Sequence, residues 1–228
     1  MKPVNVALFI ILILLLTWVY YKEQLYPEMM IVSDVDGNAY TVKKNFYNIK
    51  TASDILARLN EINMKIIDHL TTKFADSTWE DDIAFLKGNY NDGILEEHVP
   101  LTTKNTSYVL NKGDEVKICL RDKKTGKIHD FNTLVFVNLH ELSHMLDRNY
   151  GHNSSFWTSF KFILCEAVAL GLYKPVDYRK HPTSYCGIKI TSSPFFDNKS
   201  KCPVPCVDGK GSCKAKYKPG RTSFWKFS

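Results

Sequence analysis

The chain has 228 residues, enough for one domain of ordinary size together with a membrane anchor. Its formal net charge of +6 is concentrated near the C-terminus, where residues 198–228 hold eight lysines and arginines against the single acid Asp208. No nucleic-acid-binding signature accompanies these charges, so we expect no specific nucleic-acid partner. A solvated tail over residues 197–228, with weak contact to anionic lipid, is the favoured interpretation.

The first predicted element is an apolar helix at the N-terminus. Residues 4–21 hold no charged side chain, and about 18 residues at 1.5 Å each span roughly 27 Å, close to the hydrocarbon core of a bilayer. No small-residue cleavage site follows, which favours an uncleaved anchor over a signal peptide. We therefore expect a transmembrane helix over residues 1–22 in a single-pass membrane protein, of undetermined orientation because basic residues flank both ends.

The segments that follow predict a small α+β domain over residues 23–196. A β-hairpin is expected over residues 30–42, and apolar residues at helical spacing predict a helix over residues 51–74 with a capping box of Thr51 and Asp54 at its start. His69 on this helix is interpreted as a surface residue.

The middle of the domain predicts a short sheet. Residues 80–92 are polar and loop-like, with a short element near residues 83–86. Two alternating strands are then expected at residues 107–111 and 115–120, directly before the next helix, where an edge strand would hold a substrate as an added strand.

The next helix carries HELSH, His140 to His144, which is the most informative motif of the chain. Two histidines four residues apart on a helix lie on one face and can bind one metal ion. The preceding run, residues 133–139, predicts a buried helix start capped by Asn132 or Thr133. A buried helix does not carry two histidines and Glu141 without partners, so we expect a zinc site in which Glu141 is the general base.

The third zinc ligand is predicted to be His152, which follows the turn at Gly151. Glu166, in the apolar helix expected over residues 154–171, is the rival. It has three interpretations: a ligand, a hydrogen-bond acceptor for a ligand histidine, or a structural carboxylate paired with a lysine. The second of these is favoured. Beyond Tyr173 the frequent prolines predict irregular structure.

The six cysteines fall into two groups. Cys119 and Cys165 lie in apolar runs and are interpreted as core thiols. The other four lie in the loop-rich end and form disulfides if this end faces an oxidising space, or else a second zinc site: Cys186, Cys202, Cys206 and Cys213. Sequons occur at Asn105, Asn153 and Asn198, and a glycan at Asn153 would crowd the predicted metal.

The run HELSHMLDRNYGHNSSFW, residues 140–157, resembles the WLM and SprT-like minimal zinc peptidases. Residues 107–113, 132–137 and 185–190 extend the likeness to predicted metallopeptidases of large DNA viruses, which often carry an N-terminal membrane segment. The resemblance spans about residues 30–196. It implies a zincin-like fold, a short mixed sheet beside the HExxH helix, with His140, His144 and His152 as Zn²⁺ ligands and Glu141 as general base.

The predicted function is a membrane-anchored zinc metallopeptidase acting on a protein or peptide substrate. In this scheme Tyr185 is a weak candidate for an oxyanion donor, and a packed loop tyrosine is its more ordinary interpretation. Phe156 and Trp157 are expected to lock the loop of His152. Two alternatives stay open: a non-catalytic, zinc-stabilised structural protein of a viral membrane, and a DNA–protein crosslink protease by analogy with soluble relatives.

Overall fold

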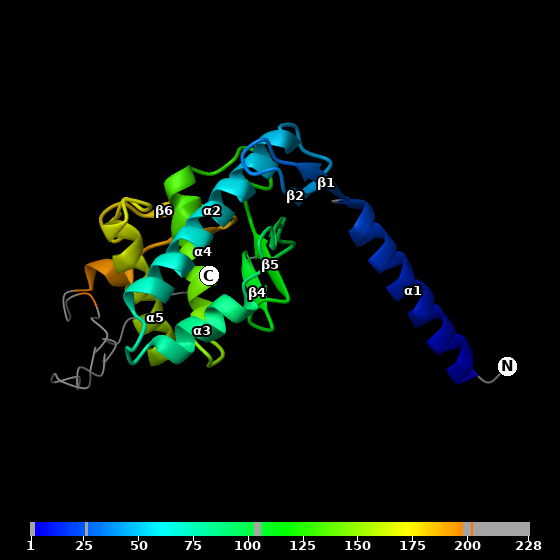
Figure 1. Ribbon diagram of the computed structural model, residues 1–228. Helices are drawn as coiled ribbons and strands as arrows, with labels where there is room; N and C mark the ends of the chain where they lie inside the picture. The colour runs from blue at the N-terminus through cyan, green and yellow to red at the C-terminus, as the bar shows by residue number, and fades with distance from the viewer. Residues whose placement is uncertain (1–2, 26, 103–105, 198–201, 203–228) are drawn as a thin grey trace.

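The computed structural model describes residues 3–25, 27–102, 106–197 and 202. They form a mixed α+β domain with α1 beside it (Figure 1), as the sequence predicted in outline. The predicted tail over 197–228 lies outside the described residues except for Asp197 and Cys202, as do Asn105, Asn198, Cys206 and Cys213. The helices are α1 (Pro3–Leu25), α2 (Ile49–Lys73), α3 (Glu80–Asn89), α4 (Phe131–Leu146), α5 (Ser154–Ala169) and the short η1 (Pro194–Phe196).

The helix α1 extends away from the domain in Figure 1, and its described apolar side chains are exposed. Among the described residues, no helix is both long enough and apolar enough to cross a bilayer, so the structure does not support the predicted transmembrane anchor over residues 1–22.

The N-terminal half of the domain places a β-hairpin on a long helix. The predicted hairpin is confirmed as β1 (Glu28–Val32) paired antiparallel with β2 (Ala39–Lys43). The helix predicted over residues 51–74 is α2, but its capping box is wrong. The helix begins two residues earlier, after Asn48 in a left-handed conformation. The Asp54 carboxylate instead accepts hydrogen bonds from the Ser33 hydroxyl and the backbone amide of Asp34.

The helix α3 is an element that the sequence did not predict beyond a short piece. Three acids in its first turn, Glu80, Asp81 and Asp82, interact favourably with the partial positive charge of a helix N-terminus. Only two of its side chains, Ile83 and Leu86, are buried. Such a narrow apolar stripe gives little periodic signal, and this is why the segment resembled a loop.

The central sheet has the order β3-β5-β4, with β3 parallel and β4 antiparallel to β5. The predicted strands correspond to β4 (Tyr108–Leu110) and β5 (Glu115–Ile118), whereas β3 (Leu95–Glu97) was not predicted. Towards the C-terminus, the region expected to be irregular contains a hairpin of β6 (Thr183–Tyr185) and β7 (Ile188–Ile190). Three residues per strand are too few for an alternating pattern to stand out.

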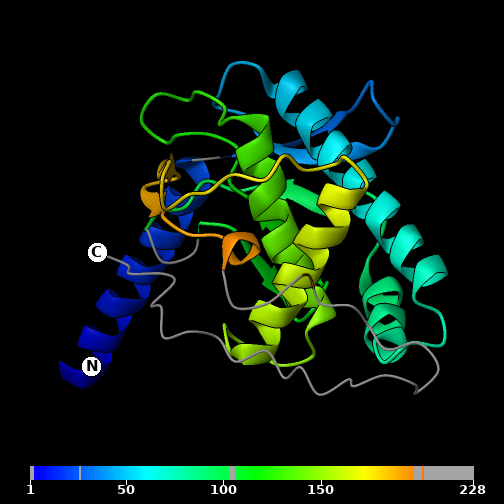
Figure 2. The ribbon, with the colours of Figure 1, turned by 90° about the vertical axis from the view of Figure 1, so that its left-hand side faces the viewer.

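The helix α4 runs through the middle of the domain and contacts α2, α3, α5 and the strands β4 and β5 (Figure 2). Its N-cap is Asp130, whose carboxylate accepts a hydrogen bond from the backbone amide of Thr133; the predicted caps Asn132 and Thr133 lie inside the helix. Nearly every side chain from Thr133 onwards is buried, which confirms the predicted buried start.

Two disulfides correct the interpretation of Cys119 and Cys165 as core thiols. Cys119, after β5, is bonded to Cys186 in the β6–β7 turn, and Cys165 in α5 is bonded to Cys202. Each bond joins an apolar segment to the C-terminal end of the domain. Cys119 and Cys165 are buried, but a run of apolar neighbours does not distinguish a buried disulfide-bonded cysteine from a free core thiol.

Candidate metal centre

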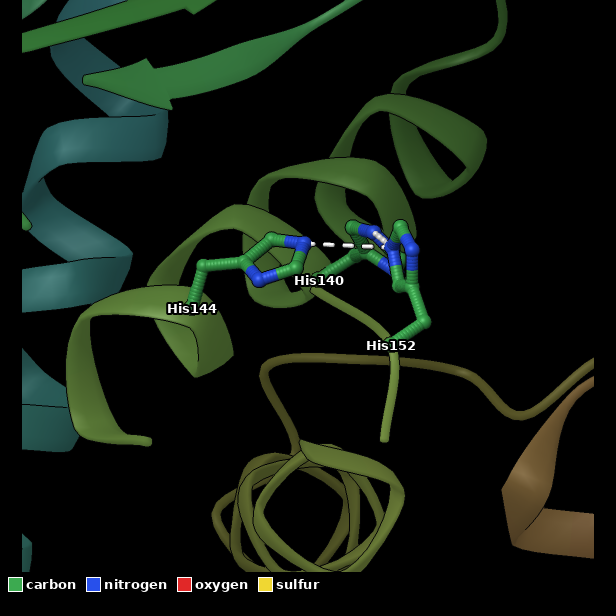
Figure 3. A group of neighbouring side chains, drawn as sticks. All are labelled: His140, His144 and His152. Carbon is green, nitrogen blue, oxygen red and sulfur yellow. Dashed lines mark hydrogen bonds between the residues drawn. The ribbon is translucent and has the colours of Figure 1, made fainter. Parts of the chain in front are cut away.

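Three imidazole side chains converge at the C-terminal end of α4. His140 and His144 lie one turn apart on this helix, and His152 arrives from the turn that joins α4 to α5 (Figure 3). The Nε2 atom of His152 lies 3.0 Å from that of His140 and 3.2 Å from that of His144. Gly151, with φ of 78°, adopts the left-handed conformation that lets the chain turn back to the helix.

The spacing of these nitrogens fits a zinc ion. Zinc binds imidazole nitrogen at about 2.0–2.1 Å in a tetrahedron, which places ligand nitrogens roughly 3.3 Å apart. The two Nε2 distances come close to this value without rearrangement. His140 is buried, His144 is half-buried and His152 is exposed, so the group opens to solvent on the side of His152. A fourth coordination position is thus reachable by water or substrate.

Aromatic side chains hold the imidazoles in place. The ring of Phe156 stacks on His144, with centroids 4.1 Å apart, and the edge of His140 meets Phe160 at 5.0 Å. The indole Nε1 of Trp157 donates a hydrogen bond of 3.1 Å to the backbone carbonyl of His152. The predicted locking of the His152 loop by Phe156 and Trp157 is therefore present in the structure.

The electrostatics of the site favour neutral histidines. Burial removes water from the three rings and so disfavours their charged forms. It lowers the pKa of His152, lowers the pKa of His140 well below its usual value, and lowers the pKa of His144 to about 3. Repulsion from His144 and His152 lowers the pKa of His140 further, and repulsion from His152 and Lys112 lowers that of His144. Neutral imidazole is the form that binds a metal ion, so the site needs no histidine deprotonation near pH 7.

Glu141 lies on the same helix, next to His140, and only 4% of it is exposed. Burial raises the pKa of its carboxyl group to about 8. Burial raises the pKa of the Tyr185 hydroxyl, and the charge of Glu141 raises it further. The Glu141 carboxyl group is therefore within electrostatic range of the β6–β7 hairpin. A buried acid next to a group of histidines that could hold a metal ion is of the kind that transfers protons in hydrolysis.

Tyr185 has the ordinary role of a packed tyrosine. It is 1% exposed, its hydroxyl donates a hydrogen bond of 2.8 Å to the carbonyl of Cys119, and the hydroxyl oxygen of Ser107 lies 2.7 Å away. These partners occupy the hydroxyl, so it is not aimed at a substrate oxyanion. The weak prediction of a donor role has no support in this geometry.

Glu166 is not part of the histidine group. One carboxylate oxygen lies 2.7 Å from Nε2 of His69 and 2.7 Å from Nζ of Lys73, both on α2. The favoured interpretation, an acceptor for a ligand histidine, is therefore wrong, and the third one, a structural carboxylate paired with a lysine, is confirmed. His69 is half-buried through the same contact.

One residue of the site had no sequence signal. Lys112, in the turn between β4 and β5, directs its ammonium group to the backbone carbonyls of His144, Asp147 and Asn149, and only 8% of the residue is exposed. A lysine in a polar turn ordinarily faces water, so neither hydropathy nor spacing distinguished it.

A WLM domain model matches residues 86–201, which include α4, α5 and all three histidines. An uncharacterized protein, R325, of Acanthamoeba polyphaga mimivirus is 31% identical over 188 residues, which cover 82% of this chain and 94% of that protein. The uncharacterized protein 042R of Invertebrate iridescent virus 3 is 36% identical over 98 residues, 43% of this chain and 60% of that protein. Protein 136R of Invertebrate iridescent virus 6 is 39% identical over 85 residues, 36% and 47% respectively. No solved structure matches the chain.

Proposed function

Because this chain belongs to the WLM domain family, we propose that it is a zinc-dependent metallopeptidase. The observation that carries the proposal is the convergence of three Nε2 atoms beside a buried glutamate on the same helix. The ligands are His140, His144 and His152, and the general base is Glu141. Three protein nitrogens with an open fourth position are typical of catalytic zinc sites rather than of closed structural ones.

The reaction follows from the placement of these groups. When bound, the ion supplies a Lewis acid that lowers the pKa of water and polarises a peptide carbonyl. Glu141 accepts the proton of the attacking water and then donates it to the nitrogen of the leaving amine. The nearby cation favours the carboxylate that the first step needs, and burial, which raises the pKa of this group, lets it hold the proton until the leaving nitrogen takes it. His140, His144 and His152 stay neutral throughout.

The substrate is proposed to bind along β4. This strand lies at the edge of the sheet order β3-β5-β4 and contacts α4, so its outward backbone groups are in position to pair with an extended peptide beside the histidines. Main-chain pairing of this kind accepts many sequences, which is the property expected of a peptidase that cleaves proteins.

The proposal is tested with Glu141→Gln. We expect this variant to bind zinc like the native chain and to cleave a fluorogenic peptide library at least about 100-fold more slowly. The matched control is Glu166→Gln, which removes a similarly buried carboxylate on the neighbouring helix and should leave cleavage nearly unchanged. His152→Ala should lose zinc, measured by metal analysis. A Glu141→Gln variant with native activity would exclude the mechanism, and a native chain that binds zinc but cleaves nothing would favour a structural site.

Membrane association through the N-terminal segment stays a prediction from the sequence, and so does the weak contact of the basic tail with anionic lipid. Liposome flotation of the full chain, compared with a chain that begins at Pro27, tests the membrane association directly.

A further inference from the structure

The turn between β4 and β5 places a lysine ammonium at the end of the metal-binding helix. The Nζ atom of Lys112 donates hydrogen bonds to three backbone carbonyls, at 2.8 Å to His144, 2.5 Å to Asp147 and 2.5 Å to Asn149. An ammonium group has three N–H donors, so all of them are used. The acceptors belong to the last turn of α4 and to the segment that leads to His152.

These carbonyls need such a partner. The last four carbonyls of an α-helix have no partner within the helix, and they carry its partial negative charge. The carbonyl of His144 is among them, and Asp147 is the C-cap. Desolvation lowers the pKa of Lys112, and the nearby carboxylate of Asp147 acts in the opposite direction. The Lys112 side chain thus pairs three backbone carbonyls at the end of α4 and in the segment that follows it.

The same segment is held from its other side. The Ser155 hydroxyl lies 2.9 Å from both carboxylate oxygens of Asp147, and the Asn149 amide donates to one of these oxygens at 3.2 Å. Ser155 belongs to the first turn of α5. The chain from Asp147 to His152 therefore lies between Lys112 on one side and α5 on the other.

The turn that carries Lys112 is itself closely packed. Lys112 and Gly113 both have positive φ, and a Cβ atom added to Gly113 would lie 2.4 Å from the carbonyl oxygen of Asn89 and 3.0 Å from Cε of Met145. This contact fixes the turn between the end of α3 and α4. The backbone that carries the Lys112 side chain is thus held in place.

We propose that Lys112 is a positioning residue for the metal centre: its ammonium group holds the segment between α4 and α5 so that His152 meets His140 and His144. The inference rests on the proposed zinc site. Because Lys112 follows β4 directly, it also couples the strand proposed to bind substrate to the helix that carries two of the ligands.

The test compares zinc affinity in two lysine variants. Lys112→Met removes the ammonium group and keeps the length of the side chain. Lys43→Met is the matched control, because Lys43 has the same 8% exposure but pairs with Glu28 in the β1–β2 hairpin, away from the histidines. We expect Lys112→Met to weaken zinc binding about 10–100-fold, the effect typical of residues that orient metal ligands, and Lys43→Met to leave it within about twofold.

Two further measurements separate positioning from general stability. The d–d absorption spectrum of the Co²⁺-substituted protein reports ligand geometry, and it should change for Lys112→Met alone. If Lys112→Met lowers the melting temperature of the metal-free chain while its zinc affinity and Co²⁺ spectrum stay native, the residue is merely structural and the proposal is overturned. A native chain that binds no zinc overturns it as well.

Lys112→Arg covers the case in which the methionine variant does not fold. Arginine keeps the charge, but its planar fork cannot direct three donors from a single atom to three converging carbonyls. We expect zinc affinity between those of the native chain and a ligand variant; native affinity would contradict the proposal. A native chain that binds zinc without cleaving peptides would reject the peptidase function and leave this inference to be decided by the affinities.

Discussion

Phe156 stacks its ring on the imidazole of His144 at an interplanar angle of 26°, and so connects the hydrophobic core to a proposed metal ligand. Phe156 is fully buried. We expect Phe156→Leu to cost about 1–2 kcal/mol in the free energy of unfolding and also to weaken zinc binding, because the ligand loses its support. Phe162→Leu is the control, since Phe162 is equally buried but stacks on Trp79. It should lose similar stability in urea unfolding while keeping native zinc affinity; equal affinities in both variants would contradict the role of the stack.

We expect the carboxyl group of Glu141 to release a proton when zinc binds. With a pKa of about 8, roughly nine in ten of these carboxyl groups are protonated at pH 7 in the metal-free chain. A nearby cation favours the carboxylate, so the proton leaves on binding. Calorimetry in buffers of different ionisation enthalpy should show about one more proton released by the native chain than by Glu141→Gln. The difference should shrink at pH 9.5, where the group is already ionised. Equal release by both chains at pH 7 would contradict the raised pKa.

Because Cys119 and Cys186 form a disulfide, we expect the domain to be more stable against unfolding when this bond is oxidised. It joins residues 67 apart in the sequence and fixes the β6–β7 hairpin beside β5. A disulfide that closes a loop of this length contributes about 2–5 kcal/mol. We expect the double variant Cys119→Ala/Cys186→Ala to lose that amount in guanidinium unfolding without reductant. A double variant as stable as the native chain would show that the hairpin is held by its other contacts.

Arg121 and Glu97 form a fully buried ion pair between the segment that follows β5 and the strand β3. The second carboxylate oxygen of Glu97 accepts a hydrogen bond from the backbone amide of Lys43 at 2.8 Å. We expect Glu97→Gln to destabilise the domain by about 3–5 kcal/mol, since it leaves a buried cation uncompensated. Glu96→Gln, beside it but paired with the partly exposed Lys117, should cost about 1 kcal/mol or less. Similar losses in both variants, measured by urea unfolding, would be inconsistent with this explanation.

The sequence predicted the elements whose signals are local and repeated. The β1–β2 hairpin follows from its turn residues, α2 from a long apolar stripe, and the histidine motif from its spacing on α4. These patterns depend on neighbours within a few residues, which a single chain displays directly. The convergence of His152 on the other two imidazoles was predicted for the same reason, since only the turn at Gly151 separates it from the helix.

The missed features depend on contacts between distant segments. Cys119 and Cys186 lie 67 residues apart, and Glu166 meets Lys73 from another helix. Lys112 contacts backbone carbonyls, which every residue type has, so the sequence does not indicate which of them a lysine binds. The helix α3 was predicted only as a short element near residues 83–86 for a different reason, because only two of its side chains are buried. For the disulfide, Glu166 and Lys112, the determining interaction joins distant segments and arises only when the chain has folded.

The position of Cys202 has a practical consequence for expressing the matched domain alone. The family match ends at residue 201, one residue before the cysteine that pairs with Cys165 near the end of α5. A clone trimmed to the family boundary would leave Cys165 without its natural mate and open to dimer formation or thiol scrambling during purification. Fragments intended for crystallisation should therefore extend past Cys202 and be produced in a secretory or otherwise oxidising host.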